Sequence, residues 1–111
     1  MDLVIGGRAQ GKKEWVKNQY PNCTIWDSFH LFVKEELQKG YSKEEIQCIV
    51  EERLMGTKDL VIISDEIGNG IVPLQKEERV YRDITGELLQ ELAKRAEKVV
   101  RITCGIAQQI K

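Results

Sequence analysis

The sequence predicts an α/β fold, a mainly parallel sheet of about four strands with flanking helices. Short apolar runs that are typical of strands alternate with longer segments whose apolar residues recur at helical spacing. The strongest run, residues 60–63, is aliphatic at every position, which is typical of a central parallel strand covered on both faces. The chain of 111 residues has the length of one domain, which we expect to span residues 1–111.

In the first half of the chain, apolar spacing and helix-breaking residues predict two strands and three helices. Pro21 ends the first helix, because proline cannot continue one, and Gly40 is a typical stop signal for the second. Ser42 and Glu45 have the spacing of a capping box and begin the third helix. The predicted strands are 3–5 and 23–26, and the predicted helices are 12–20, 29–40 and 42–56.

In the second half, the strand at 60–63 is followed by a glycine-rich loop and then by a long helix from about residue 77. Apolar residues recur at every fourth position from Val80 to Ala96, which predicts one helix face packed against a core. The last predicted strand, 99–104, alternates in polarity. We therefore place it near an edge of the sheet, with one face partly wet.

The clearest functional motif lies between the first strand and the first helix. Gly6, Gly11 and Lys12 have the G-x-x-x-x-G-K spacing of a phosphate-binding loop, or P-loop. Glycines let the backbone N–H groups turn toward phosphate, and the lysine and the helix N-terminus attract the same anion. The alternative is a glycine-rich turn that binds nothing. The predicted nucleotide site consists of Gly6, Gly7, Arg8, Ala9, Gln10, Gly11, Lys12 and Lys13.

One position departs from the P-loop motif. A Ser or Thr hydroxyl normally follows the lysine and ligates Mg2+, whereas this chain has Lys13, which has no oxygen to offer. We therefore expect phosphate binding to be intact and metal-assisted chemistry to be impaired. Asp27 follows the predicted strand 23–26 and is the candidate Mg2+ ligand, although an aspartate there also suits the N-cap of the next helix.

Other candidate side chains follow from the predicted sheet. The carboxyl ends of parallel strands meet at one edge, so Asp65 and Glu66 should lie near the P-loop unless they form only a solvated pair. His30 is the sole histidine, and its apolar helical surroundings indicate a packed or surface residue more than a catalytic one. Arg79 and Arg82 share a helix face, where they either grip phosphate or are ordinary exposed charges.

Composition narrows the range of partners and compartments. Lys and Arg number 17 and Asp and Glu 18, so the net charge of -1 gives no electrostatic basis for binding nucleic acid or an anionic membrane. No apolar stretch has the length of a membrane span, and the first residues lack the pattern of a signal peptide. The 3 cysteines have no C-x-x-C spacing, which favours reduced thiols and a cytoplasmic protein without a zinc or disulfide framework.

The second half of the chain carries the motifs of a known family. Ser64–Pro73 is similar to an [NS]-E-V-G-x-G-[IV]-V-P loop, and Arg79–Gly86 is similar to an R-x-[FY]-R-D-x-x-G helix start. Together with Gln90, Gly105-Ile106 and the terminal Ile110-Lys111, these segments resemble the bifunctional adenosylcobinamide kinase/adenosylcobinamide-phosphate guanylyltransferase family of cobalamin biosynthesis. The resemblance covers residues 60–111 nearly end to end.

This resemblance implies a RecA-like P-loop NTPase fold and a homotrimer. It also implies ATP or GTP as a substrate, adenosylcobinamide as the acceptor, and Mg2+ near Asp27. In that scheme Lys12 and the P-loop N–H groups hold the β- and γ-phosphates, while Glu66 or Arg82 positions substrate or charge.

The chain also departs from the family pattern. Family members are longer, and their guanylylated histidine lies in a segment that is missing here between Tyr20 and Cys23. His30 follows the predicted strand 23–26 and lies outside that segment, so it is not assigned the role of the guanylylated histidine. The prediction is therefore an adenosylcobinamide kinase-type phosphotransferase without the guanylyltransferase step. The alternatives are a catalytically degenerate nucleotide-binding or regulatory homologue and a P-loop kinase for another small molecule.

Overall fold

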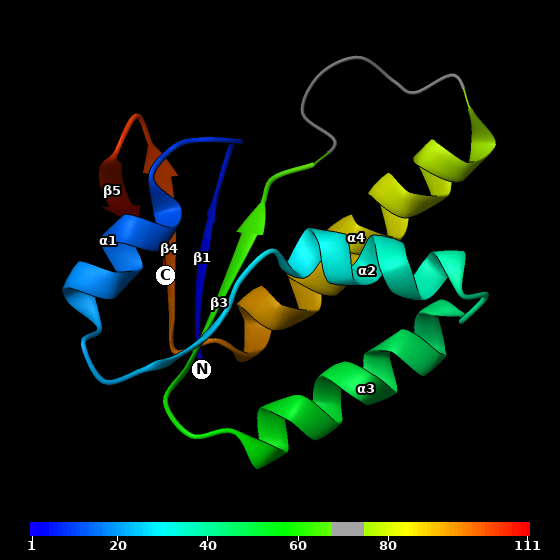
Figure 1. Ribbon diagram of the computed structural model, residues 1–111, viewed down its shortest axis with the longest axis horizontal. Helices are drawn as coiled ribbons and strands as arrows, with labels where there is room; N and C mark the ends of the chain where they lie inside the picture. Colours follow the sequence, from blue (N-terminus) through cyan, green and yellow to red (C-terminus); the bar gives the residue numbers. More distant parts are fainter. Residues whose placement is uncertain (68–74) are drawn as a thin grey trace.

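The computed structural model describes residues 1–67 and 75–111, and within them the chain forms five strands and four helices (Figure 1). Strands alternate with helical segments, as the sequence predicted, and the predicted capping box at the start of α3 is formed by Ser42 and Glu45. The elements are β1 (Asp2–Gly6), α1 (Lys12–Gln19), β2 (Thr24–Trp26), α2 (Phe29–Gln38), α3 (Lys43–Gly56), β3 (Leu60–Asp65), α4 (Lys76–Arg95), β4 (Lys98–Thr103) and β5 (Ile106–Gln109).

The strands form one sheet in the order β2-β3-β1-β4-β5. β1 to β4 are parallel, which confirms the predicted α/β class. β1 lies at the centre, where Gly6 is opposite Asp65 of β3 on one side and Ile102 of β4 on the other. Because β3 continues to Asp65, two residues beyond the predicted strand end, that side chain is fixed beside the end of β1.

The sequence did not predict β5, which pairs antiparallel with β4 and makes the sheet five-stranded. It has only four residues, Ile-Ala-Gln-Gln, which do not alternate in polarity as a typical strand does, and all four are exposed. The chain reverses at Cys104 and Gly105, both of which have positive φ (51 and 76). As a result, β4 is the second strand from the β5 edge of the sheet and is hydrogen-bonded to β1 and to β5.

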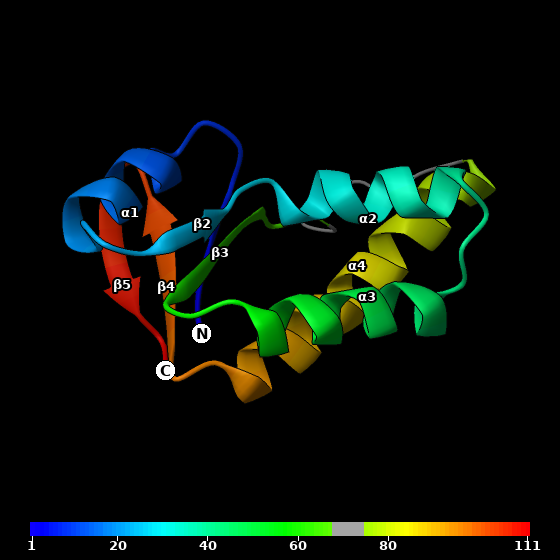
Figure 2. The ribbon, with the colours of Figure 1, turned by 60° about the horizontal axis from the view of Figure 1, so that its bottom comes forward.

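The two faces of the sheet are covered unequally. Helices α2, α3 and α4 pack on one face and α1 on the other (Figure 2). Strand alternation explains the division, because Leu3 and Ile62 point into the larger core and Val4 and Ile63 into the smaller one. No helix within residues 1–67 and 75–111 is long and apolar enough to cross a lipid bilayer.

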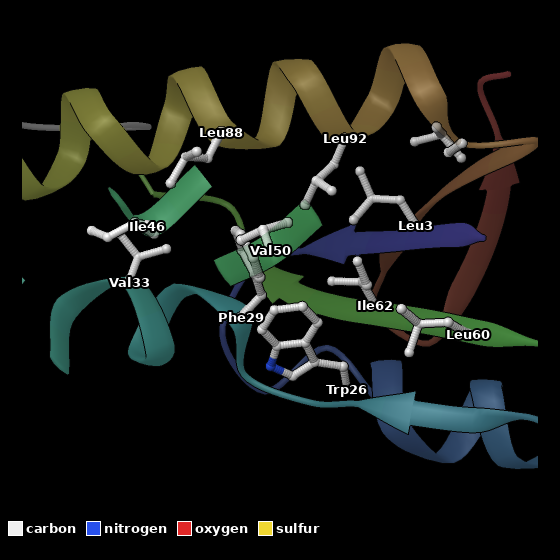
Figure 3. Packing of buried hydrophobic residues seen from close by; sticks show 12 residues of the cluster. Leu3, Trp26, Phe29, Val33, Ile46, Val50, Leu60, Ile62, Leu88 and Leu92 are labelled. Carbon is white, nitrogen blue, oxygen red and sulfur yellow. The ribbon is translucent and has the colours of Figure 1, made fainter. Parts of the chain in front are cut away.

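The larger core includes side chains from the junction between β2 and α2 (Figure 3). Phe29 is fully buried, and its ring lies 5.2 Å from that of Trp26, centroid to centroid, in an edge-to-face arrangement. Val33 lies one turn further along α2 and is also fully buried. This packing holds the first turn of α2 against the carboxyl ends of the strands, where the candidate site lies.

Replacing Phe29 by alanine tests this anchoring. We expect Phe29→Ala to lower the free energy of unfolding by about 3–5 kcal/mol, because it leaves a cavity at a fully buried position. Leu31→Ala, two residues away at a position that is 47% exposed, is the matched control and should cost less than about 1 kcal/mol. Urea denaturation of the three proteins measures both values, and equal losses would show that α2 is not anchored through Phe29.

Candidate functional site

Two glycines allow the backbone of the P-loop (residues 6–13) to turn from β1 into α1. A Cβ atom on Gly6 would lie 2.5 Å from the carbonyl oxygen of Ile102 and 3.3 Å from Cδ of Lys12, so a larger residue does not fit there. Gly11 has a φ of 83, a left-handed conformation that glycine adopts without strain, and it is the N-cap residue of α1. The chain can therefore leave β1, turn tightly and enter α1.

The turn between β4 and β5 holds the P-loop from the side. The side-chain oxygen of Gln10 accepts a hydrogen bond from the backbone N–H of Cys104, and its backbone oxygen accepts one from the N–H of Gly105 at 3.0 Å. Segments from opposite ends of the sequence are thereby joined. No local pattern pointed to this contact, because it depends on the unpredicted strand β5.

Lys12 is the central residue of the site. Its side chain is only 8% exposed, and its Nζ atom donates to the carbonyl oxygen of Gly7 at 2.7 Å. The same Nζ atom lies 2.7 Å from Oδ1 of Asp65. The ammonium is thus held inside the curve of the P-loop by one neutral and one charged oxygen, which offsets the cost of its burial.

Asp65 is held in turn by His30 on the first turn of α2. Its backbone N–H donates to Nδ1 of His30 at 3.0 Å, and its Oδ2 atom lies 3.3 Å from Nε2. Burial lowers the pKa of His30; the Asp65 carboxylate opposes this effect and the Lys12 ammonium adds to it. The imidazole is therefore neutral at pH 7, with Nδ1 as the acceptor and the proton on Nε2.

Lys13 and Asp27 form a second ion pair, with 3.5 Å between Nζ and Oδ2. Both side chains are partly exposed, and both line a cavity of about 230 Å³ at the carboxyl ends of the strands. We call this space the phosphate cavity. Its lining residues are Ala9, Gln10, Gly11, Lys12, Lys13, Glu14, Asp27, Ile63 and Asp65.

Of the predicted site residues, Lys12, Lys13 and Asp27 line the phosphate cavity, whereas Glu66 and Arg82 do not. Glu66 donates its backbone N–H to the Gly6 carbonyl at 2.8 Å, but its carboxylate pairs with Arg101 at 2.9 Å and does not line the phosphate cavity. Arg82 lies in the first half of α4, contacts Asp83 at 3.3 Å and does not line the phosphate cavity. The family-like stretch 68–73 is outside the described residues.

Asp65 and His30 belong to the candidate site more closely than the sequence predicted. The signal for Asp65 was present, since it follows the apolar run 60–63 with only Ser64 between them. His30 had no such signal, because its contact with Asp65 spans 35 positions in the chain and depends on how α2 packs.

The residues present do not form a typical site for Mg2+. Asp27 and Asp65 are each paired with a lysine, and Lys13 stands where a hydroxyl ligand is required. Across residues 1–67 and 75–111, no three His, Cys, Asp or Glu side chains gather closely enough to hold a metal ion.

Comparison with known protein families identifies the family of this chain. The family model for cobinamide kinase / cobinamide phosphate guanyltransferase matches residues 12–110. The chain belongs to this family, whose fold is that of the P-loop NTPases. The matched range begins at Lys12, so assigning residues 6–11 to a P-loop depends on their motif and on the geometry described above.

Two relatives bear the name bifunctional adenosylcobalamin biosynthesis protein CobU. The protein from Salmonella typhimurium (strain LT2) is 35% identical over 68 residues, which are 61% of this chain and 38% of that protein. The protein from Escherichia coli (strain K12) is 36% identical over 67 residues, which are 60% of this chain and 37% of that protein. The aligned part of the chain therefore spans less than two fifths of either relative.

The His30–Asp65 contact predicts a pH dependence of stability. A depressed folded-state pKa favours the neutral imidazole, so its contribution is complete above the ordinary value of about 6.5 and is lost as the pH falls toward the folded-state value. The free energy of unfolding should thus drop between about pH 7.5 and about pH 5.5, and this drop should be smaller in His30→Gln.

Because His30 is the only histidine, its imidazole signals in an NMR titration report the folded-state pKa directly. Urea denaturation at the two pH values measures the change in stability. A titration midpoint at or above the ordinary histidine value would contradict the buried, neutral state of His30.

Proposed function

We propose that this chain binds the phosphates of a nucleoside triphosphate, ATP or GTP, in the phosphate cavity. The observation that carries the proposal is the position of Lys12, which is buried within the P-loop with its ammonium between the Gly7 carbonyl and Asp65. A γ-phosphate entering the cavity would replace the Gly7 carbonyl as an acceptor for Lys12. The N-terminus of α1 favours the same anion.

We further propose phosphoryl transfer to an acceptor of the cobinamide type. Membership of a family described by cobinamide kinase and guanyltransferase activities supports this choice. Phosphoryl transfer depends mainly on positioning and on electrostatic stabilisation, which Lys12 and the P-loop N–H groups can supply. In this proposal Asp65 orients Lys12, and neutral His30 holds Asp65. Guanylyl transfer is not included, because the segment expected to carry its histidine is missing.

A second candidate is nucleotide binding without turnover, for recognition or regulation. The two ion pairs favour it, because both aspartates that line the phosphate cavity are engaged by lysines of the P-loop. A carboxylate held in this way is a weaker acceptor for the proton of an attacking hydroxyl. The homotrimer implied by the family resemblance is common to both candidates and stays a prediction for sedimentation analysis.

One experiment separates these candidates. Isothermal titration of ATP and of GTP into the purified chain measures binding, and incubation of the tighter nucleotide with adenosylcobinamide tests for a phosphorylated product. Binding with product supports the kinase, and binding without product supports the recognition function. If neither nucleotide binds, the P-loop is only a structural turn.

Lys12→Ala tests the observation that carries the proposal. We expect nucleotide affinity to fall about 10- to 100-fold, because a charge-assisted hydrogen bond contributes about 1.5–3 kcal/mol. Lys17→Ala is the matched control, since Lys17 is an exposed lysine further along α1, and it should bind as the unmodified chain does. Unchanged affinity in Lys12→Ala would show that the nucleotide is bound elsewhere.

A further inference from the structure

The Lys13–Asp27 pair occupies the part of the phosphate cavity where a P-loop protein usually holds its metal ion. Lys13 directly follows the phosphate-binding lysine, at the position of the hydroxyl that ligates Mg2+ in the motif. Its ammonium lies 3.5 Å from Asp27, the carboxylate that the sequence offers as a metal ligand. The side chain of Lys13 thus brings a permanent positive charge to this part of the cavity.

We infer that Lys13 replaces the divalent cation of the nucleotide site, so that this chain binds its nucleotide in the metal-free form. The inference rests on the proposed nucleotide binding and adds a property that the family assignment does not give. Lys12 and Lys13, with the N-terminus of α1, then neutralise the phosphates that Mg2+ neutralises elsewhere.

Electrostatics oppose Mg2+ and Lys13 at the same place. An ammonium has three donors and no acceptor, so Lys13 cannot coordinate the ion, and two cations a few ångströms apart repel each other. The second carboxylate of the cavity, Asp65, is already held by Lys12 at 2.7 Å and by His30. Asp65 could therefore join Asp27 as a ligand of Mg2+ only if its buried pair with Lys12 opened.

Lys13 is also free to change partners. Its side chain is 54% exposed and that of Asp27 is 38% exposed, so water screens the pair and little is lost when it separates. The long flexible stem of a lysine lets its ammonium move from Asp27 to a phosphate oxygen across the same cavity. In the nucleotide-free protein, Asp27 keeps Lys13 at the site; in the complex, the phosphates compete for it.

The test compares nucleotide affinity in EDTA and in MgCl2 by isothermal titration of ATP and GTP. In the unmodified chain we expect the two dissociation constants to agree within about threefold, or binding to be tighter in EDTA. Lys13→Ser restores the hydroxyl of the motif. It should weaken binding in EDTA by about tenfold or more and should make Mg2+ strengthen binding by a similar factor.

Lys17→Ser is the matched control, because it makes the same substitution on the same helix at an exposed lysine outside the phosphate cavity. It should keep the metal-independent binding of the unmodified chain. Tenfold tighter binding with Mg2+ in the unmodified chain would overturn the inference while leaving nucleotide binding in place. Absence of binding in every condition would instead overturn the proposed function itself.

Asp27→Asn provides a second measurement that does not depend on how Lys13→Ser folds. It removes the charge that competes with phosphate for Lys13, so binding in EDTA should be unchanged or tighter. If Asp27 were a metal ligand, the asparagine variant would lose affinity only in MgCl2. That result would overturn the inference.

Discussion

The register between β1 and β3 is the constraint on which the candidate site depends. Gly6 lies opposite Asp65, so the end of the buried strand β3 stands beside the start of the P-loop. Lys12 can then reach the Asp65 carboxylate at 2.7 Å from the first position of α1. A shift of one residue in this register would turn Asp65 to the opposite face of the sheet and leave Lys12 buried without its charged partner.

Charge balance links the residues of the phosphate cavity. Lys12 is paired with Asp65 and Lys13 with Asp27, and His30 contacts Asp65 in its neutral form. In the proposed complex, phosphate oxygens would take the place of the Gly7 carbonyl beside Lys12 and of the Asp27 carboxylate beside Lys13. The deeply placed Lys12 is fixed by burial, whereas Lys13 is screened by water, which gives the two lysines different freedom to follow a ligand.

The family relationship and the local geometry support different parts of the site. The family match covers residues 12–110, whereas the glycine-rich turn before Lys12 is defined by its close contacts with β4 and with the turn at Cys104-Gly105. The hairpin of β4 and β5 thus acts as a lateral support for the P-loop. The exposed strand β5 has a structural role that its short sequence did not indicate.

The sequence by itself determined the elements whose signals are local. Aliphatic runs, helical spacing and the capping box predicted the α/β class and placed most element boundaries within about two residues, because each pattern acts over a few neighbouring residues. The P-loop spacing singled out Lys12 in the same way. Only the tertiary structure decided which side chains meet. His30 contacts Asp65 because of how α2 packs, Glu66 pairs with Arg101, and Lys13 at the start of α1 pairs with Asp27 after β2. Such contacts between distant parts of the chain are set by sheet order and helix packing.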